Sequence, residues 1–388
     1  MKSFVPLLLA LAIGAGPASH AFAASSSHHT GAKVAKTAKA AKSAKLVKKA
    51  KSKAAKPVPA PSRPSIDYDG EQVNFSEWQA VRDFEDDMVQ RNGFERAEVE
   101  AAVGKLRFID SAVQLVKPAP PGKPKNWQAY SGRFIEPIRI NAGLRFWNEN
   151  AAQLARAEAQ YGVPAEIIVG IIGVETIYGR DTGRFRVMDV LATLAFAYPE
   201  SPNRNDRMQF FRSELEKTMM LARQENIDPF SLLGSFAGAV GMPQFMPSNI
   251  LKYGVDYDGD GIVDLRNSAA DAIGSVANFL VAHGWDRNAT GPSVFPADVA
   301  PSMAWEPLLG GLEARYQPAE LQGAGVVTRT PLPEQRTYGL IDLQNGADPT
   351  EYWVANANFF AITKYNRSYF YAMSVIELGR AVRLSRAS

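Results

Sequence analysis

The sequence predicts a mainly α-helical protein of the α+β class, in which amphipathic helices carry one small, partly β element. Apolar residues recur at helical spacing over most of the chain from residue 76 onward. The stretch 291–350 differs, because it is rich in Gly, Pro and Thr and holds short β-like runs at 325–330 and 337–343. Residues 24–65 have too few apolar side chains to add to a core.

The first 23 residues have the pattern of a signal peptide. Lys2 precedes an apolar stretch from Phe4 to Ala15, and Ala21-Phe22-Ala23 fits a small-x-small cleavage site. The apolar stretch is too short to span a bilayer, and no later stretch is long and apolar enough. We therefore expect export and a soluble protein in the periplasm. The chain has no Cys, which excludes disulfides.

Residues 24–65 are predicted to form a disordered tether. Ten lysines lie between Lys33 and Lys56, and a Pro-rich run follows up to Pro64. Without these lysines and Lys2 the chain keeps 32 basic against 40 acidic residues, so the folded part carries a net charge of about −8. The tether is either a solvated spacer, which we favour, or a binder of anionic wall or membrane surfaces. Nucleic acid is excluded as a partner, because the chain is exported and its folded part is acidic.

Residues 66–388 are predicted to form the folded region, beginning with a peripheral helical subdomain in 66–138. Within it, 76–91 and 96–106 have apolar residues at helical spacing. A longer helix is expected over 139–161, where Gly162 ends it before Pro164 begins the next helix. Further helices are expected at 189–197, 207–224 and 268–284, and from about residue 357 to the C-terminus with an interruption near Asn366.

Glu175 lies in the last turn of the apolar helix that starts at Pro164. Apolar surroundings disfavour a carboxylate, and the carbonyl dipoles at a helix C-terminus repel negative charge. Both effects raise the pKa, so Glu175 is a candidate proton donor near neutral pH. The structural alternative is a buried carboxylate paired with Arg180 or Arg184.

Several motifs in one order carry a family resemblance. The run 173–179 (GVETIYG) is followed by 238–248 (GAVGMPQFMPS), by an Asp-rich loop and by 271–278 (DAIGSVAN). From about Trp127 to Val382 the chain resembles the membrane-bound lytic murein transglycosylase B family. The resemblance implies a lysozyme-like core at 139–290 and a lyase that cleaves the β-1,4 bond between N-acetylmuramic acid and N-acetylglucosamine in peptidoglycan without water. The products would end in 1,6-anhydromuramic acid. Members of this family are often lipoproteins, but this chain has no Cys to carry that anchor.

The resemblance also implies roles for the second motif. Ser235 would hydrogen-bond Glu175 and orient it, Gln244 would lie in the sugar cleft, and Phe245 and Met246 would shape the apolar wall of that cleft. The small residues of the motif let backbone approach a ligand closely. A close helix crossing with Gln244 bonded to backbone is the structural alternative.

The C-terminal segment 351–388 would complete the cleft, since the family lines it with a Tyr-Asn pair and a later Tyr. On this basis Tyr365, Asn366 and Tyr371 are candidate substrate contacts. An aromatic helix packed in the core would explain Tyr371 equally well.

Two positions depart from the family. Phe279 stands where the family often has a cleft Tyr, and the Arg pair thought to meet peptide stems is changed. Arg207 can be matched to that pair as a substrate contact, whereas Arg204 cannot be placed.

The loop 256–271 matches the first half of a calcium-binding loop, with carboxylates at positions 1, 3 and 5 and Gly at position 6. Position 12 is Asn267, so by resemblance a later Asp closes the loop. The predicted ligands are Asp256, Asp258, Asp260, the carbonyl of Ile262 and Asp271. A solvent-exposed acidic turn is the alternative. The Ca²⁺ would be structural, because glycosidic cleavage by carboxylates needs no metal, and no organic cofactor is expected.

The matched motifs supply only one carboxyl group for catalysis. Glu175 would therefore act first as an acid and then as a base, while the substrate's own N-acetyl group stabilises the cationic centre. One alternative is a hydrolytic muramidase, whose second carboxylate would be Asp189, Glu214 or Glu216. The other is a non-catalytic peptidoglycan-binding protein. Peptidoglycan glycan strands are the expected partner, and we expect a monomer.

Overall fold

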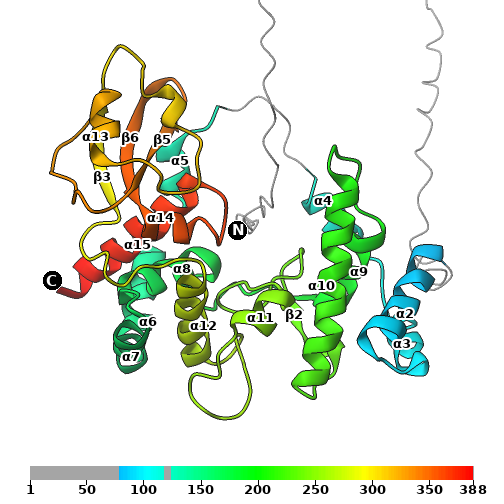
Figure 1. Ribbon diagram of the computed structural model, residues 1–388. Coiled ribbons are helices and arrows are strands. Elements are labelled where there is room, and N and C mark those ends of the chain that lie inside the picture. Colours follow the sequence, from blue (N-terminus) through cyan, green and yellow to red (C-terminus); the bar gives the residue numbers. More distant parts are fainter. Residues whose placement is uncertain (1–77, 118–123, 388) are drawn as a thin grey trace, which may run out of the picture. The chain divides into compact units, whose positions relative to one another are not determined.

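The computed structural model describes residues 78–117 and 124–387, and within them the chain is mainly helical with a small sheet (Figure 1). The predicted fold class is confirmed. The predicted signal peptide (1–23) and tether (24–65) lie outside the described residues. In the part of the chain that is described, no helix is both long enough and apolar enough to cross a membrane.

The first helices of the described chain pack on two helices from the middle of the sequence. The Phe84 ring meets the Phe196 ring edge-on, with 6.1 Å between their centroids, and the Asn92 amide donates to Glu216 Oε1 at 2.9 Å. This group comprises α2 (Gln79–Asn92), α3 (Arg96–Val103), α4 (Asp110–Leu115), α9 (Val187–Phe196) and α10 (Arg204–Gln224).

The helix α5 (Trp127–Ser131) falls within the predicted peripheral segment 66–138 but packs against other elements. The Trp127 ring makes a T-shaped contact with Phe370, with centroids 5.5 Å apart. The Gln128 amide donates to Asn345 Oδ1 at 3.0 Å. The segment therefore contributes to two different groups of helices.

Four helices pack against α8 (Ala165–Thr176), which carries Glu175: α6 (Pro137–Glu149), α7 (Ala151–Tyr161), α12 (Ala269–Ala282) and α15 (Tyr369–Ala387). The prediction of a single helix over 139–161 is wrong, because α6 and α7 meet at Asn150, which has φ −116° and ψ 26°. The Asn150 amide donates to the Phe146 carbonyl at 2.8 Å, a local bond that competes with the helical backbone.

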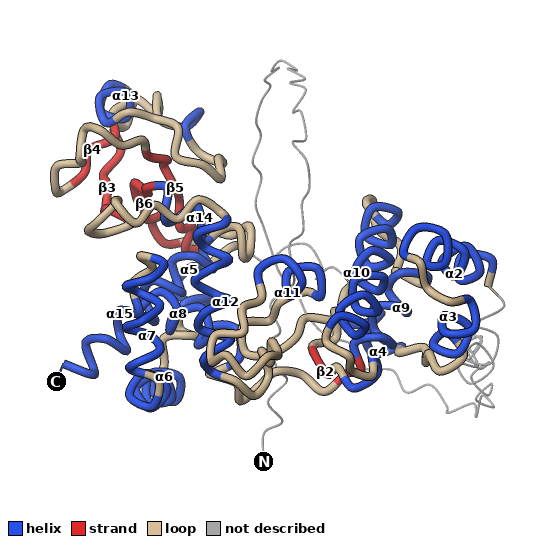
Figure 2. Tube along the Cα trace, turned by 60° about the horizontal axis from the view of Figure 1, so that its bottom comes forward, coloured by secondary structure: helices blue, strands red, loops and turns tan. Residues whose placement is uncertain are grey.

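Two glycines let α8 and α15 cross with their backbones in contact (Figure 2). A Cβ atom at Gly170 would lie 2.2 Å from the Val375 carbonyl oxygen, and one at Gly379 would lie 2.0 Å from that of Glu166. No larger residue fits at such distances without movement of the backbone. Because the earlier position in α8 contacts the later position in α15, the two helices are antiparallel. The last turn of α8 therefore lies beside the first turn of α15.

A four-stranded antiparallel sheet in the order β4-β3-β6-β5 forms the predicted β element (Figure 1). Phe295, Tyr338 and Val354 lie in its separate apolar core. The strands are β3 (Val294–Val299), β4 (Val326–Thr328), β5 (Tyr338–Asn345) and β6 (Asp348–Asn356), and α13 (Pro318–Gly323) accompanies them. Residues 351–356, predicted as the start of the C-terminal cleft segment, are therefore strand.

β6 leads directly into α14 (Ala357–Ile362), and the Asn356 side chain caps that helix by accepting from the Asn358 amide at 3.0 Å. The break before α15 confirms the predicted interruption near Asn366. The remaining elements are the short pair β1 (Phe185–Arg186) and β2 (Leu233–Gly234), the helix α11 (Pro247–Tyr253), and two short 3-10 helices, η2 (Pro229–Ser231) and η3 (Glu306–Leu308).

Replacing Gly170 by Ala is expected to destabilise the fold by about 1–3 kcal/mol, because the added methyl group forces α8 and α15 apart. Gly323→Ala is the matched control: it lies in a helix, and a Cβ there meets nothing within 4 Å. Urea unfolding of both variants measures the difference. Equal stability of the two variants would contradict a tight crossing.

Candidate active site

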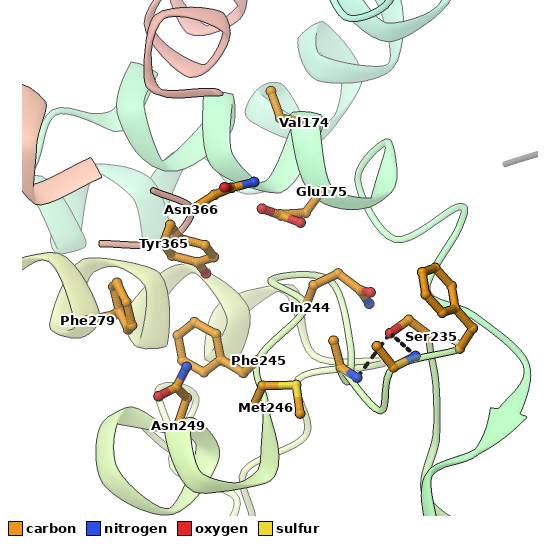
Figure 3. Close-up of a pocket in the computed structure, with 13 residues that line it drawn as sticks. Val174, Glu175, Ser235, Gln244, Phe245, Met246, Asn249, Phe279, Tyr365 and Asn366 are labelled. Carbon is orange, nitrogen blue, oxygen red and sulfur yellow. Dashed lines mark hydrogen bonds between the residues drawn. The ribbon is translucent and has the colours of Figure 1, made fainter. Parts of the chain in front are cut away.

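A pocket opens beside the end of α8, and the Glu175 side chain lies half-buried in its wall (Figure 3). Figure 3 shows the Glu175 carboxyl between the side chains of Asn366 and Gln244. The lining residues are Val174, Glu175, Ser235, Phe236, Ala237, Ala239, Gln244, Phe245, Met246, Asn249, Phe279, Tyr365 and Asn366. Seven of the nine predicted catalytic and substrate-binding residues, Glu175 among them, thus meet in one place, and only Tyr371 and Arg207 are missing from the lining.

Burial raises the pKa of Glu175 from 4.5 to about 7, as the sequence predicted, and a hydrogen bond from Tyr371 opposes this rise. The Tyr371 hydroxyl donates to Glu175 Oε1 at 2.6 Å. Among the ion pairs of the described residues none involves Glu175, and Arg180 and Arg184 are exposed. The Glu175 carboxyl group therefore has a hydrogen bond from Tyr371 and lacks the arginine partner of the structural alternative.

The structure corrects the predicted roles of Ser235 and Tyr371. The Ser235 hydroxyl lines the pocket but accepts the amides of Ala237 and Ala239, at 3.4 and 3.1 Å, as the dashed lines in Figure 3 show. Tyr371 is fully buried and is no part of the pocket lining. Tyr371, rather than Ser235, thus holds Glu175, because the antiparallel α15 brings its first turn against the end of α8.

Two side-chain carbonyls in the pocket lining have no hydrogen-bond partner. Gln244 has the left-handed φ of 52°, and its Nε2 donates to the Gly241 carbonyl at 2.9 Å. Gln244 Oε1 and Asn366 Oδ1 are both buried and unpaired. Buried acceptors without partners are costly, so a ligand that donates N–H or O–H groups would gain from reaching them.

Aromatic rings form part of the pocket lining beside these amides. The Tyr365 ring lies 4.7 Å from the Phe279 ring and 5.8 Å from the Phe245 ring, measured between centroids. The Tyr365 hydroxyl is occupied, since it donates to the Pro243 carbonyl at 3.1 Å. Phe245 and Met246 line the pocket as predicted. Such a surface suits the faces of sugar rings.

Arg207 does not reach the pocket, so its predicted substrate contact is not what the structure shows. It is buried in α10, where Nε donates to the Tyr198 hydroxyl at 3.3 Å and the guanidinium lies 5.3 Å from the Phe211 ring centre. Arg204 donates to the Tyr198 carbonyl at 2.7 Å. Aromatic rings hold Arg207 and the backbone of Tyr198 holds Arg204, which the local sequence did not reveal.

Sequence reasoning missed two polar residues of the site, Asn249 in the pocket lining and Tyr130 near Glu175. Asn249 lines the pocket from α11, just beyond the end of the second motif. Tyr130, on α5, has its pKa raised to about 12, first by burial and then by the negative charge of Glu175. No motif marks Tyr130, because α5 approaches Glu175 only through the tertiary packing on α15.

None of the candidates for a second carboxylate lines the pocket. Asp189 is paired with Arg186 at 2.6 Å. Glu214 accepts from the backbone and hydroxyl of Ser248, at 2.9 and 2.6 Å. Glu216 accepts from α2, as described above. Among the described residues, Glu175 is the one carboxyl group in the pocket lining.

The acidic loop brings together three of the predicted metal ligands. Oxygens of Asp256, Asp258 and Asp260 lie within 4.8 Å of one another, and all three side chains are exposed. Asp271 does not join them: its buried carboxylate accepts the amides of Tyr257 and Asp264, at 2.7 and 2.8 Å. Three converging carboxylates are a donor set that fits a hard cation such as Ca²⁺.

The family described as "Transglycosylase SLT domain" matches residues 76–380. This chain belongs to that family. It is also 41% identical over 315 residues to the membrane-bound lytic murein transglycosylase B of Escherichia coli, covering 79% of this chain and 83% of the relative. The predicted family is confirmed, and with it the class of enzyme, a lytic transglycosylase.

Two solved structures are similar as well. The Escherichia coli lytic transglycosylase Slt35 in complex with calcium has a TM-score of 0.72 and 39% identity, covering 81% of this chain and 96% of its own. SltB3 from Pseudomonas aeruginosa in complex with NAG-anhNAM-pentapeptide has a TM-score of 0.66 and 28% identity, covering 79% of this chain and 80% of its own.

Replacing Tyr371 by Phe is expected to raise the pKa of Glu175 further, because the lost hydrogen bond favours the ionised carboxylate. Infrared titration of the carboxyl band measures this, with Glu175→Gln as the reference that identifies the band. Tyr365→Phe is the matched control, since the Tyr365 hydroxyl donates to a backbone carbonyl. An unchanged or lower midpoint in Tyr371→Phe would show that the hydrogen bond is not what tunes Glu175.

Proposed function

We propose that this chain cleaves the β-1,4 bond between N-acetylmuramic acid and N-acetylglucosamine in peptidoglycan and leaves 1,6-anhydromuramic acid ends. The observation that carries the proposal is the single carboxyl group of the pocket, Glu175, whose pKa is raised to about 7 and which Tyr371 holds at 2.6 Å. A group with this pKa can give up and take back a proton near neutral pH.

In the proposed mechanism Glu175 first protonates the glycosidic oxygen. The bond from that oxygen to C1 of the muramic acid breaks, and the substrate's own N-acetyl group stabilises the cationic carbon. The ionised Glu175 then accepts the proton of the C6 hydroxyl, while O6 forms the new bond to C1. The atoms balance without water, and Glu175 ends protonated, ready for another cycle.

The unpaired amide carbonyls would position the sugar for these steps. Gln244 Oε1 and Asn366 Oδ1 can accept from an N-acetyl N–H or a hydroxyl group. The aromatic wall of Phe245, Phe279 and Tyr365 would cover the apolar face of a sugar ring. Phe279 offers no hydroxyl, so that position contributes contact area alone.

The carboxylates of the described chain favour this mechanism over hydrolysis. An inverting or retaining glycosidase requires a second carboxylate across the cleft, and the candidates Asp189, Glu214 and Glu216 are bonded elsewhere. A purely binding protein would have no use for an acid with a perturbed pKa at the pocket wall.

Glu175→Gln is expected to lower the rate of glycan cleavage by about a thousandfold or more, because it removes both the acid and the base. Mass spectrometry of the sugars released from purified murein sacculi measures this and also identifies the products. With the unaltered protein we expect anhydromuramic ends, and less product as the pH rises through about 7 and Glu175 loses its proton. Reducing muramic acid ends would instead establish a hydrolase.

The stability of Glu175→Gln provides the control that the variant folds. Burial raises the pKa of the folded carboxyl from 4.5 to about 7, so the unaltered protein loses stability as the pH rises between these values. The variant should therefore unfold at a higher temperature than the unaltered protein at about pH 8, and this advantage should disappear at about pH 4. An inactive variant that unfolds earlier at both pH values would point to misfolding rather than lost chemistry.

We also propose that the loop holds a structural Ca²⁺ through Asp256, Asp258 and Asp260, with the carbonyl of Ile262 as a further ligand. The similar Slt35 structure contains calcium. Asp258 also accepts from Ser268, the residue that caps α12, at 2.7 Å. An ion in the loop would therefore stabilise the start of the helix that carries Phe279, while taking no part in the proton transfers.

Removing Ca²⁺ with a chelator is expected to lower the Tm by about 5 °C, since an ion at a hundred times its Kd adds roughly 2.7 kcal/mol. Thermal unfolding with and without Ca²⁺ measures the shift. In the double variant Asp256→Asn, Asp260→Asn the Tm should no longer respond to Ca²⁺. A Tm that is independent of Ca²⁺ in the unaltered protein would leave the loop as a simple acidic turn.

The cellular setting remains a prediction. We propose a periplasmic protein, exported by residues 1–23, that acts on glycan strands as a monomer. The Lys-rich tether would connect the enzyme to its surroundings as a spacer or through an anionic wall or membrane surface. Membership of a peptidoglycan-cleaving family supports the location.

A further inference from the structure

Three elements that line the pocket each carry a basic side chain close to a lining residue. The pairs are Asn249 and Lys252 in α11, Phe279 and His283 at the end of α12, and Tyr365 and Lys364 after α14. Figure 3 shows Asn249, Phe279 and Tyr365 together on one side of the pocket. We call Lys252, His283 and Lys364 the basic wall.

Aromatic contacts place His283 and Lys252 of the basic wall close to Phe279, which lines the pocket. The His283 ring stacks on Phe279 with 3.9 Å between centroids and lies 5.0 Å from the Tyr253 ring. Lys252 Nζ lies 4.9 Å from the centre of the same Tyr253 ring. His283 Nδ1 donates to the Phe279 carbonyl at 2.7 Å, which leaves Nε2 near the Tyr253 hydroxyl. Burial lowers the pKa of His283, and the positive charges of Lys252 and Lys364 lower it further, so both lysines lie near this ring.

The two lysines have no anion of their own. Between residues 126 and 388 the chain has three lysines, of which Lys217 pairs with Glu216 at 3.6 Å. Lys252 and Lys364 are exposed, and neither forms an ion pair with any described residue. Glu313 lies within electrostatic reach of Lys364, but Arg315 pairs with it at 2.9 Å. In a folded part with an excess of acidic residues, two unpaired cations beside one pocket are available to a ligand.

We propose that the basic wall binds the carboxylate groups of the peptide stem on a glycan strand seated in the pocket, an inference that rests on the proposed function. The peptide carboxylates are the anionic groups that a peptidoglycan strand carries next to the muramic acid. Arg207, the arginine expected to meet them, is bonded to Tyr198 instead. Lysines act as mobile point charges, so the basic wall would favour strands with intact stems without fixing one peptide conformation.

Binding can be measured separately from cleavage, in the mature chain with Glu175→Gln. Calorimetry would compare a tetrasaccharide of alternating N-acetylglucosamine and N-acetylmuramic acid with peptide stems, the same tetrasaccharide without stems, and one whose stem carboxylates are amidated. Adding Lys252→Gln and Lys364→Gln should weaken binding of the first ligand about fivefold to tenfold, because two exposed charge pairs are lost. Binding of the other two should change by less than about twofold.

Matched variants make the result specific to charge and place. Lys252→Arg with Lys364→Arg keeps both charges and should keep the preference for stem-bearing ligand. Lys217→Gln removes a lysine that is paired with Glu216 and is no part of the pocket lining, and it should have no effect. An equal loss for all three ligands, or no loss for the first, would overturn the proposal. Product analysis with the unaltered protein tests the proposed function independently. If anhydromuramic ends are formed but the lysine variants have no effect on binding, the proposed function is supported and the binding of stem carboxylates by the basic wall is contradicted.

Discussion

The hydrogen bond between Tyr371 and Glu175 depends on how closely α8 and α15 cross. Gly170 and Gly379 let the two backbones touch, and the antiparallel arrangement then places the start of α15 against the end of α8. The same contact helps to bury the Glu175 carboxyl and gives it one hydrogen-bond donor. Burial favours the neutral acid and the donor favours the anion, and their balance yields a pKa of about 7, suited to a group that must first give and then accept a proton.

The pocket around this acid gathers segments that lie far apart in the sequence. The second motif supplies Gln244 and the apolar residues that follow it, α12 supplies Phe279, and the segment after α14 supplies Tyr365 and Asn366. Two of these amides keep unpaired carbonyls. Leaving buried acceptors unpaired costs stability. The pocket therefore resembles a binding site in which a ligand, rather than the protein, donates hydrogen bonds to these two carbonyl oxygens.

The acidic loop and His283 of the basic wall contact opposite ends of α12. Asp258 bonds to the capping residue Ser268 at the start of α12, and His283 stacks on Phe279 at its other end. An ion in the loop would therefore be structural in its effect on the pocket, while the lysines beside His283 would act on the ligand directly. The scarcity of lysine in the folded part makes these two unpaired positions distinctive.

The sequence by itself determined the helical class, the position of Glu175 in the last turn of an apolar helix and the segments that line the pocket, because helical periodicity, caps and short motifs are local. Only the tertiary structure decided which hydroxyl holds Glu175, that Asp271 binds backbone amides, that Arg207 is buried among aromatic rings and that 139–161 is broken at Asn150. The first three depend on a partner that packing brings close, and the last depends on a local hydrogen bond that competes with the helix. Such partners and bonds leave no trace in the pattern of apolar residues, which is what the sequence-based predictions used.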